Sequence, residues 1–178
     1  APVAYLGSVP LVVSVNNEVP VKTLKELVAL AKSKPNQLTY ASSGNGGSPH
    51  LSAETFKIAT DTQILHVPYK GGGAAMTDLI SGNVHMLFAS VLETSAYIKS
   101  GKLKGLAITS KQRVPALPDT PTLHEVGLPG VNLGVWWSLM APAGLPAPVG
   151  RHSAHRPVPD GSSHPRPLCS GFPAEPSD

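Results

Sequence analysis

The chain has 178 residues, of which 41% are hydrophobic and 14% charged, and its formal net charge at pH 7 is +3. We expect one domain with one ordinary core, and the scattered basic residues do not indicate nucleic-acid binding. No apolar run approaches the roughly 20 residues that a membrane-spanning helix needs. The single cysteine, Cys169, excludes an internal disulfide and a cysteine-based metal site.

Short apolar runs alternate with helical patterns along most of the chain. The expected strands are 9–16, 38–40, 63–68, 84–88, 106–109 and 135–140. The expected helices begin after Thr23, at Pro49, after Gly73, at Leu92 and at Thr122, and the first of them ends before Pro35. Strands that alternate with helices of about ten residues predict an α/β fold with a mostly parallel sheet of βα units.

The stretch 38–57, LTYASSGNGGSPHLSAETFK, is typical of a strand, a tight loop and a helix. We expect Ser48 to cap the helix, with Pro49 in its first turn. Residues 41–48, the first glycine loop, would let an anion approach the main chain and the positive end of the helix. The same pattern is as typical of a tight connection that binds nothing. Neither a Walker loop nor a dinucleotide fingerprint is present.

Residues 69–73, YKGGG, form a second glycine loop after the strand at 63–68. Both loops therefore follow parallel strands, at the edge where ligands of open α/β sheets bind. Lys70 and Tyr69 add a cation and a hydroxyl, although a loop lysine is more often only solvated. Ser42 and Ser43 could contact a ligand or could bond within their own turn.

Prolines interrupt residues 114–148, and Trp136 and Trp137 would point to opposite faces of the last strand. One tryptophan could lie in the core while the other faces a partner domain or a cleft, although the core is favoured for both. Residues 150–178 are rich in Pro, His, Ser and Arg and lack any period, so we expect an irregular, disordered tail. Its histidines at 152, 155 and 164 lie in a proline-rich segment, and no metal site is expected there.

Read together, the segments resemble the periplasmic solute receptors of tripartite tricarboxylate transporters, the TctC or Bug family. The resemblance covers about residues 1–149. It is carried by the following pieces, in this order and spacing: APVAYLGSVPLVVSVN, LKELVALAK, LTYASSGNGGSPHLSAE, HVPYKGGGAAMTDLISGNVHMLFAS, GKLKGLAITSKQRVPALPDTPTLHEVGLPGV and WWSLMAPAGLPAPV.

The resemblance implies that residues 1–141 are the second lobe of a type II-like periplasmic binding protein, with the return to the first lobe starting at about 134–149. It implies capture of a small carboxylate or dicarboxylate between two lobes, a periplasmic location, membrane transporter subunits as partners, and neither catalysis nor a cofactor. The ligand-binding residues that it implies are Ser42, Ser43, Gly44, Asn45, Gly46, Gly47, Ser48, His50, Tyr69, Lys70, Gly71 and Gly72.

The chain departs from the family's pattern at three places. The family's first lobe normally precedes the point where this chain begins. Ala89 stands where the family usually has an aspartate near Phe88. Residues 150–178 replace a long amphipathic helix, and we hypothesise that they are an out-of-frame translation, in which case a one-base shift near codon 149 restores that helix. Without a first lobe, Leu11, Val12 and Trp136 should be exposed and favour dimerisation.

Two other functions remain open at this stage. An effector lobe of a LysR-type regulator shares the two-lobed architecture, and an upstream helix-turn-helix would identify it. A small-molecule hydrolase could use His50 or His66 as a base beside Ser42 or Ser43. However, no acid stands at a supporting spacing and no GxSxG elbow is present, so an enzyme is disfavoured. We expect His66 and His85 to be structural.

Overall fold

The computed structural model describes the backbone of residues 2–131 and 133–140, and the side chains of this part from residue 6 onward. The chain divides into two compact units, of which Tyr5–Trp137 is the larger, and the other comprises Ala1–Ala4 with Ser138–Asp178. The larger unit contains nearly all of the regular structure. The expected tail at 150–178 lies outside the described residues.

The larger unit is built on one mixed sheet with the strand order β3-β2-β4-β1-β5. The strands are β1 (Pro2–Asn16), β2 (Thr39–Ser42), β3 (Leu65–Pro68), β4 (Met86–Ser90), β5 (Leu103–Ile108) and β6 (Gly134–Met140), which pairs with β1. The strands β3, β2 and β4 pair in parallel, as expected. The first strand, β1, runs antiparallel to both β4 and β5, so the expected parallel direction is wrong for β1. The alternation of strands and helices does not reveal that β1 lies between β4 and β5 and runs in the opposite direction.

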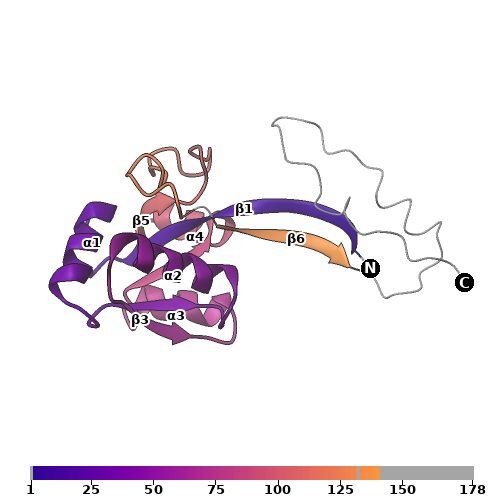
Figure 1. Ribbon diagram of the computed structural model, residues 1–178. Helices are drawn as coiled ribbons and strands as arrows, with labels where there is room; N and C mark the ends of the chain where they lie inside the picture. Colours follow the sequence, from indigo (N-terminus) through magenta and orange to yellow (C-terminus); the bar gives the residue numbers. More distant parts are fainter. Residues whose placement is uncertain (1, 132, 141–178) are drawn as a thin grey trace, which may run out of the picture. The chain divides into compact units, whose positions relative to one another are not determined.

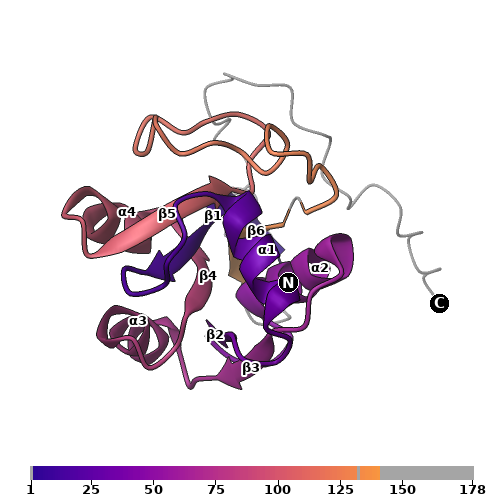
Figure 2. The same ribbon diagram turned by 90° about the vertical axis from the view of Figure 1, so that its left-hand side faces the viewer.

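Helices cover both faces of the sheet, as Figures 1 and 2 show. The helices are α1 (Leu24–Ser33), α2 (Ser48–Thr60), α3 (Gly72–Ser81) and α4 (Val91–Lys99). One face packs α1 and α2 on a core that includes Leu27, Phe56 and Phe88, and the other packs α3 around Leu79. Each fully buried large side chain contributes about 1.5–3 kcal/mol. This α/β architecture confirms the expected fold class.

Helix starts follow the expected capping chemistry only in part. Thr23 caps α1 and accepts from the Glu26 N–H at 3.3 Å, although the Glu26 carboxylate accepts from the N–H of Lys22 and does not close the box on Thr23. The prediction that Ser48 caps α2 is wrong, because Gly47 is the N-cap and Ser48 already belongs to the first turn. The loop glycine therefore takes the boundary position.

Three further expectations need correction. The segment 122–126 forms hydrogen-bonded turns and not a helix, because Pro121 and Gly127, whose φ is +90°, bracket too few residues. Leu11 and Val12 are fully buried in the sheet. Trp136 and Trp137 are exposed, by 58% and 45%, so the favoured placement of both tryptophans in the core is wrong.

His85, expected to be structural, joins two neighbouring strand ends. Its Nδ1 accepts a 3.1 Å hydrogen bond from the main-chain N–H of Thr39 and lies 2.9 Å from the Thr39 hydroxyl. In the described part of the chain, no helix combines the length and apolarity needed to cross a bilayer.

Candidate ligand-binding site

The two glycine loops lie against each other because they follow adjacent parallel strands. Ser42, the last residue of β2, pairs in register with Pro68, the last residue of β3. The N–H of Tyr69 donates to the carbonyl of Ser42 at 2.9 Å. A Cβ at Gly44 would lie 3.7 Å from the carbonyl oxygen of Tyr69. The carboxyl ends of both strands thus present their loops at one place.

A hollow of about 360 Å³, the main hollow, opens where these loops meet the end of β4. It receives the first turns of three helices, α2, α3 and α4. Its lining residues are Ser43, Gly47, Ser48, Pro49, Gly72, Leu87, Phe88, Ala89, Ser90, Leu92, Glu93, Val135 and Trp137. The lining combines small polar groups with apolar walls, which is the usual make-up of a small-molecule site.

The first turns of α2 and α3 keep main-chain N–H groups for an external acceptor. The N-cap residues of these helices are Gly47 and Gly71, and neither supplies a side-chain oxygen. The first N–H groups of a helix lack partners within the helix, and the helix dipole adds positive charge at this end. In contrast, α4 is closed by a complete capping box between Ser90 and Glu93. The hollow therefore offers two helix starts that can receive an anion.

Four of the twelve predicted residues line the main hollow: Ser43, Gly47, Ser48 and Gly72. The hydroxyls of Ser43 and Ser48 add donors to the main-chain N–H groups. Gly44, Gly46 and Gly71 have φ values of 137°, 78° and 124°, which L side chains rarely adopt, so these glycines shape the two loops.

Ser42 is fully buried, and its hydroxyl is engaged within the turn. It donates to the carbonyl of Gly44 at 3.1 Å, accepts from the Gly44 N–H at 3.2 Å, and lies 2.6 Å from Nε2 of His66. This is the local bonding expected of a turn serine. The Ser42–His66 pair therefore holds the loop, and a buried hydroxyl is poorly placed to attack a substrate.

His50 and His66 belong to a stacked cluster with Tyr40. The ring centroids of His66 and Tyr40 lie 4.7 Å apart, and those of His50 and His66 lie 4.4 Å apart. His50 Nδ1 also accepts from the Gly46 N–H at 3.3 Å, which ties the first glycine loop to α2. Burial, and then the neighbouring His50, lower the pKa of His66. The two rings thus support the loop from outside the main hollow.

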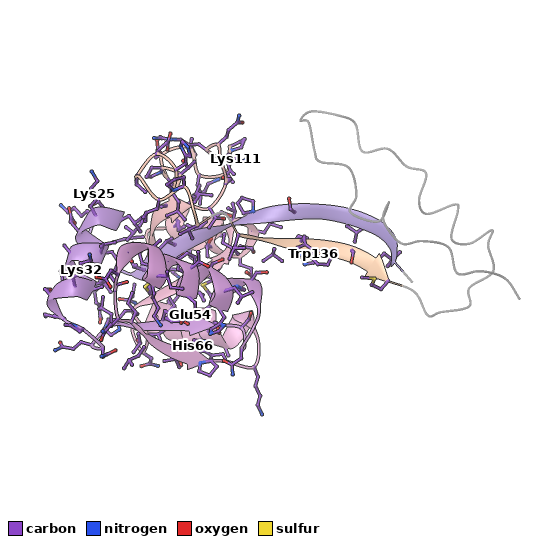
Figure 3. The ribbon with its side chains drawn as sticks, viewed as in Figure 1. Lys25, Lys32, Glu54, His66, Lys111 and Trp136 are labelled. Atoms are coloured by element: carbon purple, nitrogen blue, oxygen red, sulfur yellow. The ribbon has the colours of Figure 1, made fainter. Side chains whose placement is uncertain are left out.

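An ion pair closes the same cluster. Glu54 accepts from the Tyr40 hydroxyl at 2.5 Å and from Nζ of Lys57 at 2.8 Å. Burial alone would raise the pKa of Glu54, but the bonds from Lys57 and Tyr40 lower it. Burial and the bond to Glu54 raise the pKa of Tyr40 far above its ordinary value. Figure 3 labels Glu54 on α2 and His66 on β3, which lie close together in that view.

The side chains of the second glycine loop lie away from the main hollow. The Tyr69 hydroxyl donates to Oδ2 of Asp78 at 2.6 Å, and this bond raises the pKa of Tyr69 to about 12. Lys70 is exposed and, like Asn45, is not among the residues that line the hollow. The loop reaches the site through its main chain.

Sequence reasoning missed the contribution of the β4–α4 junction. Ser90 and Glu93 line the hollow together with Ala89, which stands where the family usually has an aspartate. The signal was present as Ser-x-x-Glu at 90–93, a capping box, but the strand was expected to end at Phe88 and the helix to begin at Leu92. Placing the boundary at Ser90 would have identified both residues.

A second hollow of about 270 Å³ lies near the end of β5. It is lined by Thr109, Ser110, Lys111, His124, Leu128, Pro129 and Val131. Lys111 gives it a cation that the main hollow lacks, although it receives neither glycine loop. Among the described residues, no group of three His, Cys, Asp or Glu side chains is arranged to hold a metal ion.

Known proteins identify the family. The family model described as the tripartite tricarboxylate transporter family receptor matches residues 1–157. The chain is 36% identical over 143 residues to protein BugT of Bordetella pertussis, covering 80% of this chain and 44% of BugT. It is 35% identical over 147 residues to an Agrobacterium vitis protein from the ttuE-ttuC' intergenic region, covering 83% of this chain and 42% of that protein.

Solved structures agree. A structure of an R. palustris protein with adipate has a TM-score of 0.81 and 34% identity, covering 85% of this chain and 50% of that one. MatC from Rhodopseudomonas palustris, with bound malate, has a TM-score of 0.79 and 31% identity, and the match covers 84% of this chain and 51% of MatC. The periplasmic binding protein BugD has a TM-score of 0.80 and 35% identity, and the match covers 84% of this chain and 50% of BugD.

The chain spans about half the length of the curated relatives that it matches. Of these structures, BugD is described as a periplasmic binding protein, and MatC was solved with bound malate. With the family match covering most of its length, this chain belongs to the receptor family of the tripartite tricarboxylate transporters.

Proposed function

We propose that this chain is the second lobe of a solute receptor that captures a small carboxylate or dicarboxylate for a tripartite tricarboxylate-type transporter. The observation that carries the proposal is the convergence of two helix starts without side-chain caps, those of α2 and α3, on the main hollow. The relatives bound to adipate and to malate support a carboxylate ligand.

The binding chemistry follows from the lining. A ligand carboxylate would accept charge-assisted hydrogen bonds from main-chain N–H groups at Ser48 and Gly72 and from the Ser43 hydroxyl. The apolar walls at Phe88 and Val135 would contact the ligand's carbon chain. In a two-lobed receptor the first lobe would complete the desolvation of the carboxylate, so this lobe alone should bind weakly.

The remaining predicted contacts divide into two groups. We assign Ser42, Gly44, Gly46, Gly71 and Tyr69 to shaping and fastening the two glycine loops. Asn45, His50 and Lys70 stay predictions for a closed, two-lobed state. We also propose that the protein works in the periplasm with membrane subunits of the transporter, as the family's name and the periplasmic relatives suggest.

We infer that the site binds its ligand without reacting with it. Ser42 and His66 are the one serine–histidine pair that could suggest hydrolysis in the described part of the chain, and Ser42 is fully buried. Its hydroxyl is already bonded within the turn. A nucleophile must reach its substrate, so this pair is better suited to holding the loop.

We further propose that this chain self-associates through exposed apolar side chains. Leu92, Trp136 and Trp137 are 66%, 58% and 45% exposed. Large exposed apolar groups that gather on one protein commonly mark an interaction surface. Figure 3 shows Trp136 on β6.

Calorimetric titration of the 178-residue chain with malate and with adipate tests the proposed function. Gly47→Asp adds a negative charge at the lining without a close contact, since a Cβ there meets no atom nearer than 3.7 Å. We expect it to weaken binding at least about tenfold. Gly130→Asp, at an exposed site with open space, is the matched control and should bind as the parent does. Equal binding by both variants would contradict the proposal, and conversion of the ligand would overturn the receptor assignment.

A further inference from the structure

The Glu93 carboxylate has a fixed orientation at the main hollow. Its Oε2 accepts from the Ser90 N–H at 3.2 Å and from the Ser90 hydroxyl at 2.8 Å. The Ser90 hydroxyl accepts from the Glu93 N–H at 3.3 Å in return. These three bonds form the capping box that starts α4. The box leaves Oε1 as the outward oxygen of a positioned carboxylate.

The outward oxygen points toward the first residue of α3. A Cβ built at Gly72 would lie 3.1 Å from Oε1 of Glu93, the nearest atom that it would meet. Both residues line the main hollow. Gly72 thus leaves room for the carboxylate, and an acceptor stands beside one of the two helix starts that are proposed to receive the ligand.

Glu93 also sets the charge balance of the main hollow. Among the thirteen described lining residues it is the only one with a charged side chain, and neither lysine nor arginine is among them. Ala89, another lining residue, has no polar atom in its side chain. The main-chain N–H groups at Gly47, Ser48 and Gly72 suit one carboxylate, whereas a second carboxylate near Glu93 would meet a like charge at close range.

From this arrangement we propose that Glu93 is a specificity-determining residue, which selects ligands carrying an ammonium or another N–H donor opposite their carboxylate. The proposal rests on the proposed function and narrows its ligand class to amino-carboxylates. An ammonium group near Oε1 would form a charge-assisted hydrogen bond, and the carboxylate end would remain at the glycine loops. A dicarboxylate of the same length would bind more weakly, because Glu93 would repel its second carboxylate.

Matched ligand pairs test the proposal. Succinate and β-alanine form one pair, and adipate and 5-aminopentanoate form the other; in each, an ammonium replaces one carboxylate. Dissociation constants of the 178-residue chain come from amide shifts in NMR titrations, which detect weak binding. We expect the amino-carboxylate to bind at least about threefold more tightly in one pair or both, as suits a partly exposed ion pair.

Glu93→Gln keeps the capping box, because glutamine also serves at this position. It should remove the preference and leave the amide spectrum otherwise unchanged. Glu125→Gln is the matched control: Glu125 accepts from the Thr122 N–H at 2.7 Å in an equivalent box away from the main hollow. It should keep the parental preference. Gly72→Ala, which displaces Oε1 without removing the charge, should reduce the preference as a second variant.

A preference that Glu93→Gln and Gly72→Ala leave unchanged would overturn the role of Glu93, while the proposed function would stand. A preference of the parent chain for the dicarboxylates would likewise overturn the role of Glu93 and leave the proposed function standing. If none of the four ligands shifted the amides of Gly47, Ser48 and Gly72, the proposed function itself would fail.

Discussion

The main-chain N–H of Tyr69 donates a 2.9 Å hydrogen bond to the carbonyl oxygen of Ser42. This bond continues the parallel ladder of β2 and β3 by one step and fastens the second glycine loop to the first. Gly47 and Gly72, one from each of these loops, both line the main hollow. Changes in either loop should therefore affect stability and ligand binding together.

Replacement by alanine should change the free energy of unfolding in opposite directions at Gly71 and at Gly73. Gly71 has φ +124°, so Gly71→Ala strains the main chain even though no atom lies within 4 Å of the new Cβ. We expect a loss of about 1–2 kcal/mol in the free energy of unfolding. Gly73 lies in the first turn of α3 with equally open space, and Gly73→Ala should be neutral or add up to about 1 kcal/mol.

Urea unfolding followed by circular dichroism measures both variants. Equal effects at the two positions would show that the left-handed conformation of Gly71 does not limit substitution. A loss at Gly73 alone would contradict the described helix start.

Protonation of His66 should destabilise the fold at mildly acid pH. Burial, and then the charge of His50, lower its pKa from the ordinary 6.5. Between the lowered pKa and 6.5 the unfolded chain therefore binds more protons than the folded chain, so stability falls as the pH drops through this window. His50, Tyr40, Glu54 and Lys57 face the same ring cluster.

Urea unfolding curves, recorded about every half pH unit between pH 7.5 and 5, measure how the free energy of unfolding depends on pH. His66→Gln should flatten the slope in this window. His124→Gln, at an exposed histidine, should retain it. A slope that survives in His66→Gln would assign the titration to another group.

The Tyr69 hydroxyl should be dispensable for ligand binding because it is bonded to Asp78. Tyr69→Phe should leave the affinity for a carboxylate within about twofold, whereas Ser43→Ala should weaken it several-fold through loss of a charge-assisted bond. A large loss of affinity in Tyr69→Phe would instead show that its hydroxyl contacts the ligand.

Asp78→Asn tests the same bond spectroscopically. The carboxylate holds the phenol proton and raises the pKa of Tyr69 to about 12, so its removal should bring that pKa back toward 10. Ultraviolet titration of ionised tyrosine, compared between the parent and Tyr69→Phe, assigns the shift to this residue.

Much of this architecture follows from local sequence rules. The helix starts after Thr23 and near Pro49, the stop at Gly82, and the adjacency of the two glycine loops follow from capping preferences and βα alternation. The direction of β1 does not, because it depends on which distant strands pair with residues 11–16.

The candidate site was predictable to a similar extent. The small residues of both loops indicate that a ligand can approach the main chain closely. The orientations of the neighbouring side chains, however, depend on tertiary contacts. The Tyr69 hydroxyl bonds to Asp78 and the His50 ring packs at a tilt against His66, and neither partner follows from spacing alone. Glu93 could have been found from its capping box, as described above.

Replacement of the exposed tryptophans should reduce self-association. Trp136→Ser and Trp137→Ser together remove two of the four large exposed apolar side chains of β6. Sedimentation velocity at increasing concentration should show association of the parent and a more monomeric double variant. Thr55→Ser, at a half-buried position on α2, serves as control. A parent that stays monomeric over the concentration range would contradict the proposed self-association.

The convergence of both glycine loops on one anion site is tested most directly by mapping a bound carboxylate onto assigned amide resonances. On titration with malate or adipate, the account predicts saturable shifts at Ser43, Gly47, Ser48 and Gly72 with one common dissociation constant. The amides of Ser110, Lys111 and His124 at the second hollow should stay unshifted. Shifts confined to the second hollow, or different dissociation constants for the two loops, would contradict the account.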